Sequence, residues 1–345
     1  MSVQSFDPLP ARRAVTSTEL ILDTMEARLV DELPSGAGWQ FEPKWDGFRC
    51  LVYKDGKDVK LTAKSGKSLS RFFPEIVTAI ESTSFKRFTL DGELIIEVEG
   101  EPSFDALQMR LHPAASRIDK LSRETPATFM AFDCLRDKNG RSVIDMQLEK
   151  RRRALESLVA AFSGEGRTEL TQYTTDRRVA LRWLNGGLPG IDGVIAKRLD
   201  APYSPGERSM LKVKRIRTAD CVVGGFRYEA AKKVVGSLLL GLFDEAGKLH
   251  HVGFTSALSR QEKPKLTKVL ETLISPPGFT GDAPGGPSRW SNARSAEWQP
   301  LKPELVAEVR YDHVTGHRFR HGTKFVRWRP DKSPKQCTFA QILAD

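Results

Sequence analysis

The amino-acid sequence predicts an α+β protein with two domains, a larger one of strands and helices and a smaller one built mostly of strands. Its 345 residues are enough for two hydrophobic cores. Strand and helix patterns alternate up to about residue 217, and beyond it short strands dominate. We therefore expect a leader over residues 1–20, a first domain over 21–217 and a second domain over 218–345.

The strands of the first domain are indicated by alternating apolar and polar residues. This alternation over residues 39–64 predicts a hairpin and places Lys44 in the turn just before a strand. Another strand is expected over 88–97, where Asp91 and Glu93 share one face because side chains alternate along a strand. Apolar residues at helical spacing and capping residues predict helices over three segments: 18–29, 146–162 and 176–185.

The second domain shows five short segments with strand character and one basic helix, over 259–274. A Gly- and Pro-rich stretch over 276–288 indicates a long loop. Five short strands with one interposed helix match a small Greek-key β-barrel of the OB type. We expect such a barrel, with strands over 222–226, 237–243, 250–254, 305–314 and 323–329.

The composition indicates a basic protein. The chain has 54 Lys and Arg residues against 44 Asp and Glu, and its pI is near 9.4. Such a surplus favours a polyanionic partner, of which nucleic acid is the commonest. A globular protein that is merely basic is the alternative.

The cysteines and the apolar residues exclude several other classes of protein. No two cysteines have the spacing of metal ligands, so neither a zinc module nor a disulfide framework is indicated, and a reducing cytoplasm is expected. No apolar run approaches membrane-spanning length, and the N-terminus lacks the apolar segment of a signal peptide, so no membrane partner is expected. The four cysteines are Cys50, Cys134, Cys221 and Cys337.

The most informative stretch is the hexapeptide KWDGFR at residues 44–49. It places Lys44 next but one to an acid, Asp46, and offers a glycine where the backbone can turn close to a ligand. Arg49 can form two parallel hydrogen bonds to a phosphate or contact a ribose. A lysine in a surface turn is the alternative interpretation of Lys44.

Five further motifs follow in order, and the whole set resembles the covalent nucleotidyltransferases, most closely the ATP-dependent DNA ligases. The resemblance runs from about residue 22 to the C-terminus. It implies a nucleotidyltransferase (adenylation) domain of antiparallel sheets with flanking helices, followed by an OB-fold domain. The motifs are LDGELI at 90–95, FMAFD at 129–133, DGVIAK at 192–197, LKVK at 211–214 and FVRWRPDK at 325–332.

The resemblance implies that Lys44 accepts AMP from ATP. The nucleophile must be an unprotonated amine, although the pKa of a free lysine is about 10.4. Neighbouring cations and desolvation can lower that pKa, and the candidates are Arg49, Lys212, Lys214 and a divalent metal. Asp46 is expected to orient Lys44 or to assist its deprotonation.

Two acids are implied as the metal site. Glu93 corresponds to a family position that contacts ribose, and Asp192 to one that contacts a catalytic metal, so the pair is expected to hold Mg²⁺ or Mn²⁺. The family usually has Glu where this chain has Asp192, and a shorter carboxylate can bind the metal through water. A structural salt bridge is the alternative for these acids.

Other residues are implied as the nucleotide pocket. Phe132 occupies the family position that stacks on adenine, although an aromatic residue in a strand is commonly part of a core. Glu42 corresponds to the position that reads the adenine amino group. Lys64 stands where ligases usually have an Arg that binds the 5′-phosphate of the nick, and it lacks the forked geometry of Arg. The residues expected to grip the α-phosphate are Lys197, Lys212 and Lys214.

The last motif lies in the second domain. The resemblance implies that this domain swings over the nucleotide, so that the motif orients the leaving pyrophosphate, and then swings away to contact DNA. A hinge is expected over 215–220. A basic strand that binds single-stranded nucleic acid is the alternative. The motif residues are Arg327, Arg329, Asp331 and Lys332.

The sequence therefore predicts an ATP-dependent DNA ligase of the bacterial LigC type that repairs nicks in double-stranded DNA. Segments 104–117 and 319–322 carry the LigC likeness, and few residues precede Lys44, so the nicotinamide-binding domain of NAD-dependent ligases is not expected. We expect a monomer near the nucleoid, with a repair polymerase or primase, or end-binding proteins, as candidate partners. An RNA ligase, a capping-type guanylyltransferase and a non-catalytic DNA-binding scaffold are the alternatives.

Overall fold

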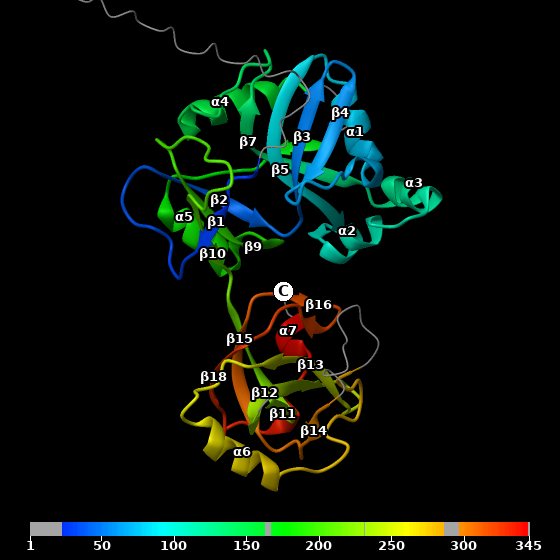
Figure 1. The fold of residues 1–345 in the computed structure, drawn as a ribbon, viewed down its shortest axis with the longest axis vertical. Coiled ribbons are helices and arrows are strands. Elements are labelled where there is room, and N and C mark those ends of the chain that lie inside the picture. Colours follow the sequence, from blue (N-terminus) through cyan, green and yellow to red (C-terminus); the bar gives the residue numbers. More distant parts are fainter. Residues whose placement is uncertain (1–22, 163–166, 231, 286–296, 344–345) are drawn as a thin grey trace, which may run out of the picture.

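The computed structural model describes residues 23–162, 167–230, 232–285 and 297–343. They form two bodies joined by one pass of the chain: a first body, residues 23–214, and a second body, residues 217–343 (Figure 1). The predicted leader lies outside the described residues. Among the helices that the structure describes, none has both the length and the apolar character needed to cross a membrane.

The larger sheet of the first body is mostly antiparallel. Its strands run in the order β4-β3-β5-β7-β8, with β6 (Glu101–Pro102) beside β5, and only β7 and β8 are parallel. The predicted hairpin is confirmed as β3 and β4, and the strand predicted over 88–97 is confirmed as β5. The bounds are β3 Phe48–Asp55, β4 Asp58–Ala63, β5 Arg87–Val98, β7 Ala127–Arg136 and β8 Thr168–Leu170.

The smaller sheet of the first body has the strand order β1-β10-β9-β2, and it corrects two predictions. The helix predicted over 18–29 is wrong at its end, because Ala27–Leu29 form β1, which pairs in parallel with β10. Lys44 lies within β2, opposite Gly193 of β9, and not in a turn. The other bounds are β2 Trp39–Trp45, β9 Ile191–Arg198 and β10 Met210–Lys214.

Helices cover the sheets of the first body, and the core lies between them. α4 (Leu148–Val159) packs against β7 and lies within the helix predicted over 146–162. The helix predicted over 176–185 is found as α5 (Arg177–Arg182), which begins where the Asp176 carboxylate accepts a hydrogen bond from the Arg178 amide. Helices not predicted from the sequence are α1 (Pro74–Glu81), α2 (Phe104–Arg110) and α3 (Ala115–Glu124).

The second body is a sheet with the strand order β13-β12-β11-β15-β18. Its two edge strands are linked by a single bridge, Thr255 to Thr323, and not by a ladder, so the closed OB-type barrel stays a prediction. A short hairpin, β16 (Val314–Thr315) with β17 (Arg318–Phe319), stands between β15 and β18. The remaining bounds are β11 Arg217–Glu229, β12 Lys232–Phe243, β13 Leu249–Thr255, α6 Lys263–Thr272, β14 Gln299–Pro300, β15 Val306–Tyr311, β18 Lys324–Trp328 and α7 Ala340–Leu343.

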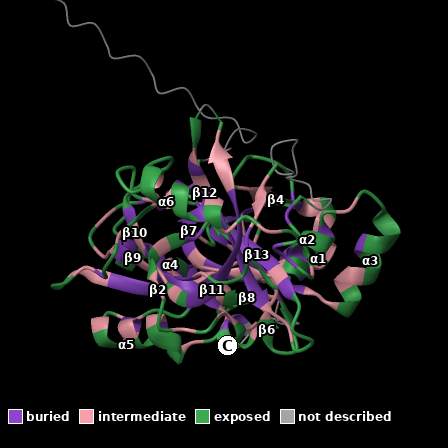
Figure 2. Cartoon of the chain, turned by 90° about the horizontal axis from the view of Figure 1, so that it is seen from below, coloured by how far each residue is buried: buried purple, intermediate pink, exposed green. Residues whose placement is uncertain are grey.

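Burial follows this division into sheets and covering helices. In Figure 2 buried residues gather on strands such as β2, β11 and β13, whereas α3 at the edge is mostly exposed. All four cysteines are free and buried. The two bodies have separate apolar clusters, one around Phe73, Phe88 and Phe129 and another around Leu240, Val252 and Phe279.

A buried ion pair ties α4 to β7 next to Phe132. Arg151 donates from Nε and Nη2 to the two Asp133 oxygens at 2.8 and 3.1 Å, and both side chains are about 1% exposed. The same guanidinium donates to the carbonyls of Met146 and Ala201. Removing one partner of such a pair leaves a buried, uncompensated charge.

We predict that Arg151→Ala lowers the free energy of unfolding by about 3–5 kcal/mol, because it leaves the buried charge of the Asp133 carboxylate without its partner. Urea unfolding, followed by a spectroscopic signal from the first body, measures this change in free energy. Arg153→Ala is the matched control on the same helix, since Arg153 pairs with Glu149 at the surface, and it should cost at most about 1 kcal/mol. Equal costs for the two variants would contradict the prediction.

Candidate active site

A cleft of about 210 Å³ opens on the first body, where its two sheets meet. Strands β2, β9 and β10 of the smaller sheet and β3, β5 and β7 of the larger sheet contribute its walls. Most of the residues singled out from the sequence are brought together here. Those that line the cleft are Glu42, Lys44, Arg49, Lys64, Glu93, Phe132, Lys197 and Lys212.

The amine of Lys44 forms an ion pair with Asp192. Its Nζ lies 2.5 Å from Asp192 Oδ2, and the side chains are 21% and 8% exposed. The two residues meet because β2 pairs with β9 and places Lys44 opposite Gly193. A Cβ on Gly193 would lie 2.1 Å from the carbonyl oxygen of Val213, so only glycine lets β10 approach this closely.

Lys212, on β10, lies on the same wall of the cleft. Burial lowers its pKa, and the charges of Lys44 and Lys214 lower it further. The amines of Lys44 and Lys212 form a cluster of basic groups in the cleft. This cluster attracts anions such as a triphosphate.

Asp46 does not bond to Lys44 in this arrangement. Its carboxylate accepts two hydrogen bonds from Arg320 Nη1, at 2.8 and 2.9 Å, and lies 3.4 Å from His313 Nε2. Both partners come from the second body, beside the β16–β17 hairpin. Lys214 likewise forms an ion pair with Asp312 of that body. The second body therefore binds two residues of the predicted catalytic set.

A network that the sequence did not predict holds Arg49. Its Nε and Nη2 donate to the two oxygens of Asp91, each at 2.6 Å. The hydroxyl of Tyr203 donates to Asp91 Oδ2, also at 2.6 Å, and both Asp91 and Tyr203 are buried. The guanidinium then lies 4.5 Å from the centre of the Phe132 ring. Asp91 belongs to a recognised motif, whereas Tyr203 lies outside every motif.

A buried ion pair also lies next to Phe132. Lys197 Nζ lies 2.7 Å from Glu42 Oε2 and 4.6 Å from the centre of the Phe132 ring. Gln40 donates to the second Glu42 oxygen. The structure therefore places Lys197 with the predicted adenine-reading residues. Lys64, at the rim, pairs with Glu26 at 2.7 Å and is 57% exposed.

The two predicted metal-binding acids have properties that fit a cation. The Oδ1 atom of Asp192 is buried and has no hydrogen-bond partner. Burial raises the pKa of Glu93 to about 7, against the opposing charges of Arg49 and Lys44. The described residues contain no cluster of three or more His, Cys, Asp or Glu side chains that could hold a metal alone. These acids therefore fit an ion such as Mg²⁺, which one or two carboxylates and substrate phosphates can hold.

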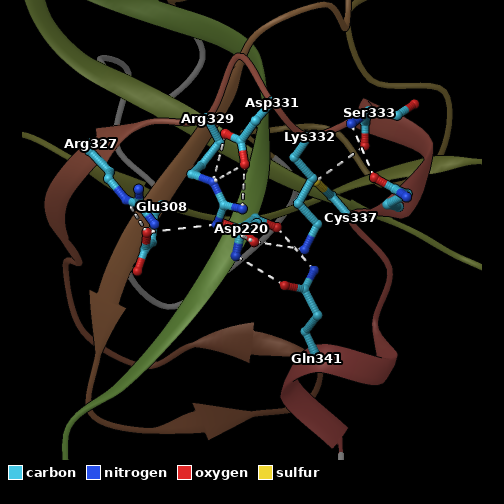
Figure 3. A network of polar contacts seen from close by, with 10 residues as sticks. Asp220, Glu308, Arg327, Arg329, Asp331, Lys332, Ser333, Cys337 and Gln341 are labelled. Atoms are coloured by element: carbon cyan, nitrogen blue, oxygen red, sulfur yellow. Dashed lines mark hydrogen bonds and ion pairs between the residues drawn. The ribbon is translucent and has the colours of Figure 1, made fainter.

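The last sequence motif lies away from the cleft. Figure 3 shows its four charged residues in a network on the second body, where Asp220 and Glu308 are their partners. Arg329 Nη1 donates to Asp220 at 2.9 Å, Lys332 Nζ donates to Asp220 at 2.7 Å, and Arg327 Nε donates to Glu308 at 2.7 Å. Among the described residues that line the cleft, none comes after Lys212 in the chain, so none belongs to the second body.

The family is decided by two matches along the chain. Residues 12–214 match the family of the ATP dependent DNA ligase domain, and residues 231–332 match the ATP dependent DNA ligase C terminal region. The chain belongs to the ATP-dependent DNA ligases. The ligase is therefore an enzyme, as the motif series predicted.

Individual relatives agree with this assignment. DNA ligase C1 of Mycolicibacterium smegmatis is 42% identical over 336 residues, an alignment that covers 93% of each chain. The multifunctional non-homologous end joining protein LigD of Mycobacterium bovis is 31% identical over 312 residues, which cover 86% of this ligase and 37% of LigD. A solved structure of a Lig E DNA ligase is 18% identical with a TM-score of 0.55, over 90% of this ligase and all of that chain, and it shows likeness of fold alone.

We predict that Glu93 makes the ligand-free ligase less stable as pH rises from about 4.5 to about 7. In that window the folded state binds more protons than the unfolded state, because folding raises the pKa of Glu93 from 4.5 to about 7. Glu93→Gln should remove this part of the decline. Unfolding free energies in a chelator, measured against pH, test it.

Glu101→Gln, at an exposed carboxylate of β6, is the control and should follow the wild type. The stability gained by Glu93→Gln should grow between pH 4.5 and 7 and stay level above that window. A gain that is the same at pH 5 and pH 8 would refute the assignment.

Proposed function

We propose that this ligase seals nicks in double-stranded DNA that carry a 5′-phosphate and a 3′-hydroxyl, using ATP and a lysyl-AMP intermediate. The observation that carries the proposal is the position of the Lys44 amine in a cleft that Phe132 also lines. A ring that can stack on a base and amines that can bind phosphates, in one cleft, suit an adenosine phosphate. The 42% identity with DNA ligase C1, in an alignment that covers 93% of each chain, supports the LigC type.

The proposed chemistry begins at Nζ of Lys44. The amine attacks the α-phosphorus of ATP, a P–N bond forms, and the P–O bond to pyrophosphate breaks. Asp192, 2.5 Å from Nζ, is placed to accept the proton that the amine loses. AMP then passes to the 5′-phosphate of the nick, where a P–O bond replaces the P–N bond. The 3′-hydroxyl then attacks the phosphorus of the nick's 5′-phosphate, which forms the new P–O bond of the joined strand and breaks the bond from that phosphorus to AMP.

The remaining cleft residues receive proposed roles from their positions. Phe132 stacks on adenine. Glu42, which forms an ion pair with Lys197, accepts a hydrogen bond from the adenine amino group. Arg49 and Glu93 contact the ribose and its phosphate. Lys212 and Lys214 stabilise negative charge as pyrophosphate leaves. Lys64 binds the 5′-phosphate of the nick, and Asp46 orients the reacting groups once Arg320 releases it.

Mg²⁺ or Mn²⁺ is the proposed metal cofactor. Asp192, through its unpartnered Oδ1, and Glu93 would hold it. When bound, the ion supplies positive charge that stabilises the phosphate oxygens. Phosphate oxygens of the nucleotide and water would supply the remaining ligands, as is usual for Mg²⁺ in nucleotide-binding enzymes.

The wider setting is also proposed. The second body acts as an OB-type domain, residues 218–345, that closes on the adenylation domain, residues 21–217, through a hinge over 215–220. In the closed form Arg327, Arg329, Asp331 and Lys332 orient pyrophosphate. The free cysteines fit a reducing cytoplasm. DNA repair as a monomer, with a polymerase, a primase or end-binding proteins, is the proposed context.

The alternatives are less well supported. An RNA ligase or a capping-type guanylyltransferase shares several motifs, but the family matches are to ATP-dependent DNA ligases. Labelling of Lys44 in competition between ATP and GTP separates these activities. A non-catalytic scaffold would not retain the amine, the acids and the aromatic ring in one cleft.

We predict that Lys44→Ala abolishes both self-adenylylation and sealing of an ordinary nick, because it removes the nucleophile. The variant should still seal a nick that already carries AMP on its 5′-phosphate, since that step needs no lysine amine. Lys60→Ala, on the exposed edge of β4, is the control. Mass spectrometry that located AMP on another lysine would sink the proposal.

We predict that Asp192→Ala slows lysine adenylylation by about a hundredfold, because Nζ loses its partner and the metal loses a ligand. Asp192→Glu should retain most of the rate, since the charge is kept. Rates measured across a titration of Mg²⁺ and Mn²⁺ test both expectations. A normal rate and metal dependence in Asp192→Ala would show that the assignment is wrong.

A further inference from the structure

A single carboxylate joins two cations of the last motif. Asp220, on β11, accepts from Arg329 Nη1 at 2.9 and 3.0 Å and from Lys332 Nζ at 2.7 Å (Figure 3). The Asp220 side chain is 10% exposed, whereas those of Arg329 and Lys332 are 20% and 23% exposed. The acid therefore lies beneath the two cations, which keep a face toward solvent.

The backbone of Asp220 is held as firmly as its carboxylate. Its N–H donates to Gln341 Oε1 and its carbonyl accepts from Gln341 Nε2, both at 3.0 Å. On its other side, Asp220 pairs with Glu308 across β11 and β15. A carboxylate fixed in this way from the sheet and from α7 can impose a position on the cations that bind it.

The pair keeps N–H groups for another anion, mainly at Lys332. Arg329 uses Nε and Nη2 on Asp331 and Nη1 on Asp220, whereas Lys332 donates one of its three N–H groups to Asp220. Two cations side by side repel each other, and a carboxylate between them reduces that repulsion and sets their spacing. An anion with several oxygens binds best where cations already converge, because little ordering is then needed.

We propose that Asp220 is a positioning residue for the transfer of AMP to Lys44: it holds Arg329 and Lys332 side by side as one binding unit for the leaving pyrophosphate. The inference rests on the proposed function. Because Asp220 lies on β11, on the same body as both cations, closure of that body carries the three residues together. The acid itself contacts neither the nucleotide nor the DNA.

A purely structural role for Asp220 makes a different prediction. An acid that only stabilises the second body would, when changed, impair every step that needs this body, including the sealing of a nick that already carries AMP. A positioning residue for pyrophosphate affects only the step in which pyrophosphate leaves. The two steps can be measured separately on the full chain.

The test is Asp220→Asn, which keeps the size of the side chain and removes its charge. Single-turnover adenylylation of Lys44 by ATP should slow by about tenfold or more, whereas sealing of a pre-adenylated nick should change by less than about twofold. Asp244→Asn is the control, because this carboxylate of the same body pairs with His250 and not with the last motif. Its two rates should match those of the wild type.

A double-mutant cycle adds a measurement of coupling between two residues, which a general loss of folding would not change. Asp220→Asn should slow adenylylation much less in a Lys332→Ala background than in the wild type, because the pair it organises is already incomplete. Gln341→Ala gives a second route if Asp220→Asn does not fold: it frees the Asp220 backbone, keeps every charge, and should slow adenylylation alone.

Equal losses in adenylylation and in sealing, or unchanged adenylylation, would overturn the inference. Additive effects of Asp220→Asn and Lys332→Ala would overturn it as well. A wild-type chain that fails to adenylate Lys44 at all would instead refute the proposed function, so the two failures are distinguishable in one set of measurements.

Discussion

The antiparallel pairing of β2 with β9 is the constraint on which the rest of the site depends. It places Lys44 opposite Gly193, so the Lys44 amine reaches the carboxylate of Asp192, the residue before Gly193. Close approach of β10, which Gly193 permits, adds Lys212 to the same wall. A shift of one residue in this register would turn Lys44 to the opposite face of the sheet. The pairing of β2 and β10 with β9 therefore positions Lys44, Asp192 and Lys212.

The charges of this ligase fall into two groups with different roles. Inside the first body, Arg49 with Asp91 and Lys197 with Glu42 form pairs whose acids are fully or almost fully buried, and the cation of each pair contacts the Phe132 ring. Between the bodies, Asp46 with Arg320 and Lys214 with Asp312 form pairs that are about one-fifth exposed. Water and ions reach the second group, which makes those pairs weaker and easier to exchange than the buried ones.

The sequence predicted the residues of the cleft better than it predicted their partners. Lys44, Glu93 and Phe132 were found because each lies in a short motif with a fixed order along the chain. Tyr203 was not found, because its contact with Asp91 depends on a fold that brings together residues 112 apart. The error at Ala27–Leu29 has the same origin, since local apolar spacing favoured a helix while pairing with β10 decided the outcome. The position of Asp46 depended on the second body, which no local pattern describes.

The buried cysteines have a practical consequence for tests of the proposed domain movement. Burial raises the thiol pKa of Cys50, Cys134 and Cys221, and that of Cys337 to about 11, so none of them offers a thiolate to a reagent at neutral pH. A cysteine introduced on the surface of each body would therefore react selectively with a dye or a spin label. The four buried cysteines would stay unlabelled, as distance measurements between labels on the two bodies require.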